Sequence, residues 1–280
     1  MRQLKGRVAL LTGASRGIGR HIAEALAAQG VHLAIAARDE TALEQVAEAL
    51  RATYGIKVLV VPTDVSERAQ LDHLVDTTVS ELGTIDLLVN NAALERMEVF
   101  AQSDPDQTDM DLWVNIRAPM YLTRRVLPGM LAQERGHIVN IASLAGLGAT
   151  AHGESYVTTK HAVVGFTRGL RASLKAQGSA VSASSVCPGF VSDVGMWARK
   201  EAAAGVRTPT LLGRSKPQAV AKAVIRVIRK DRTEQIVNPM PVRPFLVLAL
   251  LWPRLGEWLM KVTGVQRVSQ QVLDQSTPGE

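Results

Sequence analysis

Short apolar runs alternate with amphipathic stretches along most of the chain. Six runs rich in Val, Ile, Leu and Ala predict strands, at 8–11, 32–36, 58–61, 85–90, 138–141 and 180–186. Apolar residues spaced three or four apart predict helices between them, ending at residue 30 for the first and covering 40–53, 66–82, 108–133 and 154–177 for the others. Strands that are apolar throughout are buried on both faces, as in parallel sheets covered by helices. The pattern therefore predicts one doubly wound α/β domain in 1–240.

The extension that follows, 241–280, has a different pattern. Residues 245–252 are all apolar and lie between two prolines, and an amphipathic stretch follows at 255–262. Eight helical residues reach about 12 Å, which is too short for a hydrocarbon core of about 30 Å. Two tryptophans next to arginine and lysine suit a membrane surface. They suit equally a helix packed on a partner subunit or over the mouth of a substrate site, and these alternatives stay open.

Composition and charge narrow the class of protein. With 46% hydrophobic and 21% charged residues the chain is typical of a globular protein, and its single cysteine, Cys187, excludes an intramolecular disulfide. The histidines show no metal-ligand spacing, so no metal site is predicted. Four aspartates between 104 and 111 are expected on a solvated loop and a helix N-terminus.

The positive charge is confined to one part of the sequence. Residues 200–280 contain 13 lysines and arginines against 6 acidic residues, whereas the first 199 contain 19 against 20. This distribution argues against a nucleic-acid-binding face and leaves room for an acidic membrane near the extension. The first residues enter a strand without a secretory cleavage pattern, which predicts a cytoplasmic location, with peripheral membrane contact through the extension as an open possibility.

A glycine-rich loop joins the first predicted strand to the first helix. Glycines at this position allow a tight turn and let a pyrophosphate approach the backbone, while the helix N-terminus offers free N–H groups. The loop therefore predicts a dinucleotide site, and the residues expected to hold its phosphates are Gly13, Ser15, Arg16, Gly17, Ile18 and Gly19.

The residue after the second strand indicates which dinucleotide binds. An NAD site usually places a carboxylate there for the ribose hydroxyls, but this chain has Arg38. A guanidinium pairs with a 2′-phosphate, and Arg16 in the glycine loop is a second candidate for the same phosphate. The prediction is NADP(H). Asp39 keeps NAD(H) as the alternative.

Tyr156 and Lys160 are four residues apart in a predicted helix and so share one face. A phenol with its ordinary pKa near 10 exchanges protons poorly at neutral pH, and a neighbouring ammonium is expected to lower that pKa. Ser143, at the end of the fifth strand, is expected to hydrogen-bond a carbonyl or hydroxyl of a substrate.

These motifs together resemble the short-chain dehydrogenase/reductase family, of the NADP(H)-preferring type, over about residues 5–240. The marks that carry the resemblance are the Thr12–Gly19 loop, Asp64, the sequence Asn90-Asn91-Ala92-Ala93, Asn115, Ser143, Tyr156, Lys160 and Pro188-Gly189. Two positions depart from the family pattern. Ala93 stands where glycine is common, and Ser192 stands where many members have threonine.

The resemblance implies a Rossmann-type fold and a role for each matching residue. Tyr156 would be the general acid or base, Lys160 would bind the nicotinamide ribose and lower the pKa of that tyrosine, and Ser143 would orient the substrate oxygen. Asn115 would hold a water that relays protons through Lys160. The remaining cofactor contacts would be Asp64 and Val65 at the adenine, Asn91 at the ribose, and Val191 and Ser192 at the carboxamide. Pro188 and Gly189 would also contact the cofactor. The resemblance also implies a homodimer or homotetramer.

The substrate site is expected at the carboxyl ends of the strands, walled by 93–98, 144–154 and 190–215. The last of these segments carries Met196, Trp197, Val206, Leu211 and Leu212. They are read either as a lid with an apolar inner face or as residues that pack on the core. A lid of this kind predicts a hydrophobic ketone or secondary alcohol as substrate. A non-catalytic nucleotide-binding regulator, or a membrane-peripheral scaffold with the same fold, is the alternative function.

Overall fold

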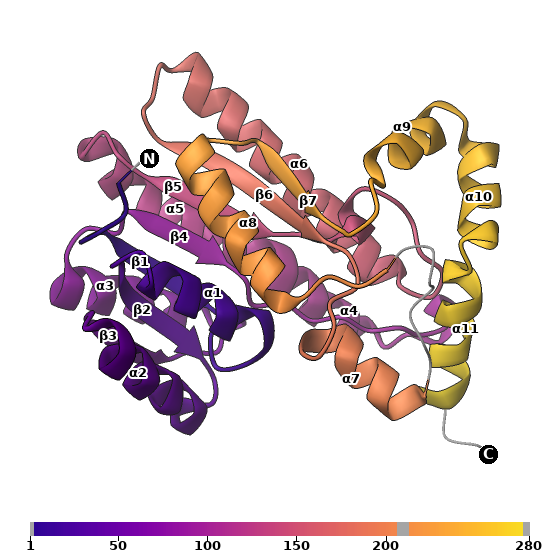
Figure 1. Cartoon of the computed structure of the whole chain (residues 1–280), viewed down its shortest axis with the longest axis horizontal. Helices are drawn as coiled ribbons and strands as arrows, with labels where there is room; N and C mark the ends of the chain where they lie inside the picture. The colour runs from indigo at the N-terminus through magenta and orange to yellow at the C-terminus, as the bar shows by residue number, and fades with distance from the viewer. Residues whose placement is uncertain (1–2, 206–212, 277–280) are drawn as a thin grey trace.

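The computed structural model describes residues 3–205 and 213–276 (Figure 1). Within them, seven parallel strands form one sheet in the order β3-β2-β1-β4-β5-β6-β7. The strands are β1 Val8–Thr12, β2 His32–Ala37, β3 Val58–Pro62, β4 Leu87–Asn90, β5 His137–Ile141, β6 Ser182–Pro188 and β7 Glu234–Val237. The helices of the domain are α1 Gly17–Ala27, α2 Glu40–Tyr54, α3 Arg68–Leu82, α4 Pro105–Leu112, α5 Ala118–Ala132, α6 Glu154–Ala176, α7 Gly195–Ala204 and α8 Pro217–Lys230. The predicted doubly wound sheet is confirmed.

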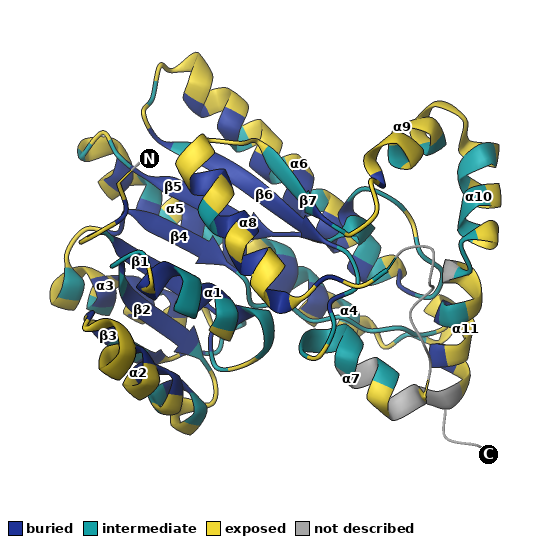
Figure 2. Cartoon of the chain, in the orientation of Figure 1, coloured by how far each residue is buried: buried dark blue, intermediate teal, exposed yellow. Residues whose placement is uncertain are grey.

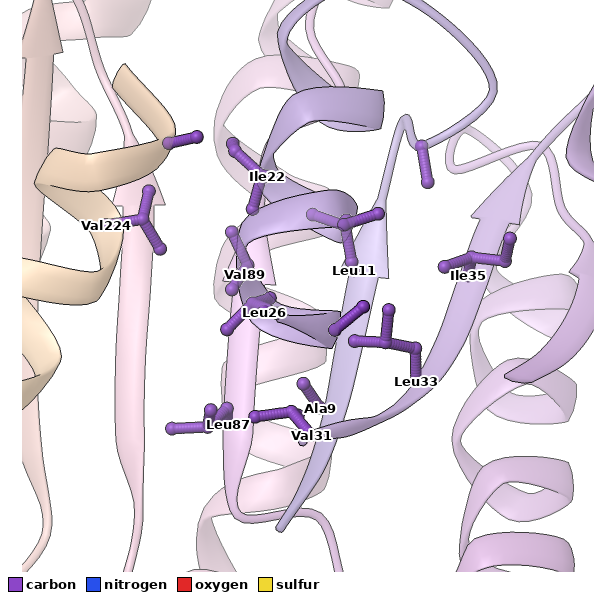
Figure 3. Packing of buried hydrophobic residues seen from close by; sticks show 14 of the residues in the cluster. Ala9, Leu11, Ile22, Leu26, Val31, Leu33, Ile35, Leu87, Val89 and Val224 are labelled. Atoms are coloured by element: carbon purple, nitrogen blue, oxygen red, sulfur yellow. The ribbon is translucent and has the colours of Figure 1, made fainter. Parts of the chain in front are cut away.

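Both faces of the sheet are buried, as the apolar runs require. In β1 the side chains alternate between two cores, with Ala9 and Leu11 on one face and Leu10 on the other. The first core contains α1, α2 and α8, and Figure 3 shows Ile22 and Leu26 of α1 lying over β1 and β4. The second core contains α3, α5 and α6. This layering leaves the carboxyl ends of the strands as the edge where polar groups collect.

Two elements at the end of the domain were not predicted. Helix α8 buries one apolar face against α1, and β7 adds an edge strand parallel to β6. β7 has only two apolar residues, too few to stand out as a strand. The turn before β7 is held by Arg171 of α6, whose buried guanidinium donates to both carboxylate oxygens of Asp231 (2.7 and 2.9 Å) and to Ser182 (2.6 Å).

The single helix predicted over 108–133 is interrupted. A π-helical turn, Trp113–Arg117, separates α4 from α5, and the amide of Ala118 donates to the carbonyl of Trp113, five residues earlier. Pro119 explains the interruption, because it has no N–H to donate to the carbonyl of Asn115 and its ring crowds that carbonyl. The π turn therefore lies at Asn115, one of the predicted catalytic residues.

Three further helices follow β7: α9 Arg243–Leu251, α10 Pro253–Val262 and α11 Val265–Ser276. We call them the C-terminal arm. In Figure 1 the arm descends along one end of the molecule, from the β7 side toward α7. Figure 2 shows that much of α9 is exposed. The arm is thus an addition to the sheet domain and not part of its core.

Candidate active site

The glycine loop lies where the strand order reverses, between β1 and β4. Gly13 and Gly17 have φ angles of +66° and +62°, which side chains other than glycine rarely adopt. The side-chain amide of Asn91 fixes the loop from the β4 side, because it donates to the carbonyls of Thr12 and Gly13 (both 3.0 Å). Helix α1 begins at Gly17, and no side chain caps its first amides. A helix N-terminus of this kind fits the phosphates of a dinucleotide.

The predicted selectivity residues lie at the ends of β2 and β3. Arg38 is 71% exposed, and its Nη1 lies 3.9 Å from Oδ2 of Asp64. The other carboxylate oxygen of Asp64 accepts from the amide and hydroxyl of Ser66. Asp39 is the N-cap of α2, since its Oδ1 accepts from the amide of Ala42 (3.0 Å). Arg38 is therefore accessible at this edge, while the carboxylate of Asp39 is already engaged in capping.

Four other predicted cofactor residues lie in the glycine loop and in the loop after β3. Arg16 is exposed and is the residue before α1. The carbonyl of Val65 accepts from the indole N–H of Trp113 (3.1 Å), so the loop after β3 is tied to the π turn. Ser15 and Ile18 lie in and just after the glycine loop and are half-buried.

The predicted catalytic residues meet at the end of β5. Lys160 is buried, and its Nζ lies 5.5 Å from the ring centroid of Tyr156 and donates to the carbonyl of Ile141 (3.1 Å). Ser143 lies two residues after the end of β5, and its hydroxyl accepts from the amide of Ala145 (3.1 Å), capping a short 3-10 turn. Strand β5 and helix α6 thus bring the serine, the phenol and the amine into one place.

Asn115 connects this group to the loop after β4. Its side-chain oxygen accepts from the amide of Leu94, and its side-chain nitrogen donates to the carbonyl of Leu94 (both 2.8 Å). The same nitrogen lies 3.1 Å from the hydroxyl of Thr159, which donates to the carbonyl of Tyr156 (2.8 Å). Thr159 was not among the predicted site residues, since a lone threonine within a helix carries no sequence signal for such a role.

Burial controls the pKa values of Tyr156 and Lys160, the predicted catalytic pair. It raises the pKa of Tyr156 well above its ordinary value, and the charge of Glu95 raises it further, whereas a hydrogen bond with Ser143 acts in the opposite direction. Burial lowers the pKa of Lys160 to about 8. The predicted lowering of the Tyr156 pKa is therefore wrong for this structure. The ammonium lies over the ring and bonds to Ile141, and it does not offset the burial of the phenol.

The other predicted cofactor residues follow β6. Gly189 donates its amide to the carbonyl of Val237 in β7 (3.0 Å), and Val191 forms an isolated parallel bridge with Ser215. The hydroxyl of Ser192 donates to the carboxylate of Asp193 (2.8 Å). Pro188 ends β6, and Cys187 before it is fully buried, which raises the pKa of its thiol to about 12. This thiol is a neutral core group.

The loop after β4 is anchored by a buried ion pair. Arg96 donates to the carboxylate of Asp111 in α4, which is only 1% exposed, and to the carbonyl of Gln107 (3.0 Å). Burial raises the pKa of Asp111. The expectation that all four aspartates lie in solvent is therefore wrong for Asp111, because its charge is needed inside to hold Arg96. Asp104 does cap α4, as expected.

The last helix of the arm covers the expected substrate loops. Val272 of α11 packs with Met97 from the loop after β4 and with Trp197 of α7, which contacts Phe190 at a ring-centroid distance of 4.5 Å. Val206, Leu211 and Leu212, also predicted for the lid, lie outside the described residues.

Two polar contacts hold α11 to the loop before α6. The hydroxyls of Thr150 and Ser269 are 3.1 Å apart, and His152 is 2.8 Å from the side-chain oxygen of Gln270. Of the three positions considered for the extension, α11 occupies the one beside the substrate loops.

Comparison with known proteins agrees with this architecture. The sequence profile described as short chain dehydrogenase matches residues 7–205. A ketoacyl reductase, HetN, of Nostoc sp. is 38% identical over 251 residues, which cover 90% of this chain and 85% of the relative. A D-beta-hydroxybutyrate dehydrogenase of Cupriavidus necator is 36% identical over 67% of this chain and 72% of its own length.

Solved structures of short-chain dehydrogenases and ketoreductases share the fold of this chain. A short chain dehydrogenase/reductase from Burkholderia phymatum in complex with NAD has a TM-score of 0.78 at 28% identity and covers both chains completely. A variant of actinorhodin polyketide ketoreductase with NADPH has a TM-score of 0.76 at 29% identity and covers 85% of this chain and 97% of its own. The fold is that of an α/β oxidoreductase with a Rossmann-type sheet. The chain belongs to the short-chain dehydrogenase/reductase family.

The charge of Glu95 gives a test of the pKa values in the site. Glu95→Gln removes a negative charge that raises the pKa of both Tyr156 and Lys160. Since the pKa of Lys160 is about 8, we expect the limb of the kcat/KM pH profile that reports loss of the Lys160 proton to move to lower pH. Glu98→Gln changes the charge of the same loop by the same amount, and we expect it to leave the limb in place. An unchanged profile in Glu95→Gln, or equal shifts in both variants, contradicts the assignment.

The packing of α11 can be tested without any substrate. Val272→Asp places an unpaired carboxylate against Met97 and Trp197, which should release α11 from the loops. We expect backbone amides of α11 to exchange with solvent about tenfold faster or more, measured by hydrogen exchange. Gln271→Asp, at the neighbouring exposed position, should leave exchange unchanged. Equal exchange in the two variants would mean that the cluster does not hold the helix.

Proposed function

We propose that the protein is an NADP(H)-dependent oxidoreductase that interconverts a hydrophobic ketone and a secondary alcohol. The observation that carries the proposal is the placement of Lys160 at 5.5 Å from the Tyr156 ring, next to Ser143 and beyond the carboxyl end of β5. A buried phenol and amine at this edge of a doubly wound sheet are positioned for proton transfer to a bound substrate. The ketoacyl reductase and hydroxybutyrate dehydrogenase relatives support a carbonyl or alcohol substrate.

A nicotinamide cofactor, when bound, would supply or accept the hydride at the substrate carbon. Tyr156 gives the proton to the carbonyl oxygen in reduction and removes it from the hydroxyl in oxidation, and Ser143 orients that oxygen. Lys160 binds the ribose. Asn115 ties the loop at Leu94 to α6, because its side chain hydrogen-bonds both the backbone of Leu94 and the hydroxyl of Thr159. Because burial raises the pKa of Tyr156, the phenol carries its proton at neutral pH, as the proton donor of a reduction must.

The preference for NADP(H) over NAD(H) rests on charge at the end of β2. Arg38 is exposed there, and Arg16 is exposed before α1, so both guanidinium groups are accessible to a 2′-phosphate. Asp39, the residue that would favour NAD(H), has one carboxylate oxygen engaged in capping α2. The relative crystallised with NADPH is consistent with this preference, whereas the one in complex with NAD leaves the alternative to experiment.

The preference for a hydrophobic substrate rests on the apolar residues beside the site. Met97, Trp197 and Val272 pack together where the loop after β4, α7 and α11 meet, and Phe190 contacts Trp197. Apolar walls with few polar groups select substrates by burial of apolar surface. A homodimer or homotetramer and a cytoplasmic location remain predictions from the family resemblance and the sequence.

The decisive variant is Tyr156→Phe. In an assay of NADPH oxidation across a panel of ketones, we expect kcat to fall by about 10²- to 10⁴-fold because the proton donor is lost. Tyr121→Phe is the matched control, since it removes a phenol hydroxyl of α5 that donates to the carboxylate of Asp72 in α3 (2.7 Å), and it should keep the wild-type rate. Wild-type turnover by Tyr156→Phe contradicts the mechanism, and NADPH binding without turnover by the wild-type protein supports the regulator instead.

The cofactor preference is tested with Arg38→Ala. We expect the KM for NADPH to rise about tenfold, because a charge-assisted contact with the 2′-phosphate is lost, while the KM for NADH changes little. Arg20→Ala removes another exposed arginine, which pairs with Glu24, and should change neither constant. Equal effects of Arg38→Ala on both cofactors would argue against a 2′-phosphate contact.

A further inference from the structure

Part of the C-terminal arm presents a continuous apolar surface to solvent. Leu250 is 76% exposed and Leu251 is 64% exposed, both at the end of α9, and Trp252 follows in the turn to α10. No charged residue occurs between Arg243 and Arg254. We call this the arm surface, and its large exposed residues are Phe245, Val247, Leu248, Leu250, Leu251, Trp252, Trp258 and Val262.

Contacts with the sheet domain cover only a small part of the apolar surface of α9. On the inner side, Leu246 lies close to Gly148 and Ala249 lies against Gly256 of α10. The other apolar side chains of α9 lie on exposed positions (Figure 2). A helix that is apolar around its whole circumference is normally buried, so the arm surface requires an apolar environment from outside the chain.

Basic groups border the arm surface at both ends. Arg243, the first residue of α9, also lines a surface hollow of about 480 Å³ between α6 and β7. The charged residues around this hollow are five cations, Arg168, Arg171, Lys175, Arg232 and Arg243, and two anions, Asp231 and Glu234. Glu234 pairs with Arg168 and Arg243, and Asp231 pairs with the buried Arg171, so the hollow keeps an excess of positive charge that includes the exposed Lys175 and Arg232. At the other end, Arg254 and Lys261 lie exposed on α10 beside Trp258. Apolar side chains and tryptophans bordered by cations match the interface of an anionic bilayer.

We propose that the arm surface docks the protein on an anionic lipid bilayer. Helix α9 lies in the interface, its Leu250–Trp252 turn enters the acyl region, and the basic hollow faces lipid phosphates. The nine residues of α9 reach about 14 Å, which suits a helix lying within the interface rather than across a hydrocarbon core of about 30 Å. Among the described residues, no helix combines the length and apolar character needed to span a membrane.

A second copy of the chain fits this surface less well than a bilayer. A two-fold contact through α9 would bring each basic border close to the basic border of its partner, because such a contact pairs the same patch on both chains. The turn between α9 and α10 also lies at the outer edge of the molecule (Figure 1). An apolar apex of this kind enters fluid acyl chains readily, whereas a stable protein interface needs about 800 Å² of complementary surface on each partner.

The experiment is co-sedimentation of the full chain with vesicles, which requires no knowledge of the substrate. We expect binding to phosphatidylcholine vesicles that contain phosphatidylglycerol, and at least fivefold weaker binding to phosphatidylcholine alone. The double variant Leu250→Glu/Leu251→Glu should lower binding at least tenfold. Val79→Glu is the matched control, since Val79 is an exposed aliphatic residue on α3, and it should bind like the wild-type protein.

The basic hollow is tested separately. Lys175→Glu should remove most of the phosphatidylglycerol dependence, whereas Lys222→Glu, an equal charge change at an exposed position of α8, should preserve it. Two outcomes overturn the proposal. The first is equal sedimentation of Leu250→Glu/Leu251→Glu and wild-type protein. The second is a wild-type protein that does not bind vesicles and whose oligomer, measured by light scattering, dissociates in the same double variant, because then a second copy covers α9.

Discussion

The structure depends on one constraint, which is that every central strand must be covered on both faces. Leu10 packs in one core while Ala9 and Leu11 pack in the other, so neither face of β1 can carry a polar site. Ligand groups are therefore confined to the strand ends. The carboxyl ends of parallel strands lie together, and the reversal of strand order between β1 and β4 opens a crevice there. The glycine loop, Ser143 and the loop carrying Glu95 all follow strands that end at this edge.

Burial at this edge also sets the pKa values of Tyr156 and Lys160. It disfavours charge, so it raises the pKa of Tyr156 and lowers that of Lys160, and both changes reduce ionisation within the pair. The charge of Glu95 raises both pKa values, so it opposes the effect of burial at Lys160 and adds to it at Tyr156. A carboxylate near the site thus helps to keep both the phenol and the ammonium protonated. The network from Leu94 through Asn115 to Thr159 fixes the loop that carries this charge.

The sequence alone predicted those parts of the molecule that are specified by residues close together along the chain. Six strands, the glycine loop and the 156–160 spacing follow from apolar periodicity and from residue types at fixed distances. β7 was missed because two apolar residues do not distinguish a strand, and its place is set by Arg171 from a distant helix. The π turn at Asn115 had a local signal in Pro119, which could have predicted an interruption but not its π geometry. The burial of Asp111 and the roles of Thr159 and Glu95 depend on contacts between distant segments, which periodicity does not reveal.

The C-terminal arm shows why an apolar sequence alone could not locate that segment. The three helices are adjacent in sequence, yet they differ in burial. Helix α11 contacts the expected substrate loops through Ser269, Gln270 and Val272. In α9, by contrast, Leu248, Leu250 and Leu251 are exposed. The two helices differ in exposure because they differ in contacts. Helix α11 packs against Met97 and Trp197, whereas the outer side of α9 has no packing contact within the described residues. Helix α10 packs against both α9 and α11. A partner that binds α9 would therefore be linked, through α10 and α11, to the loops of the candidate site. The apolar environment at α9 would thus lie at one end of three successively packed helices, and the last of them, α11, lies beside the expected substrate loops.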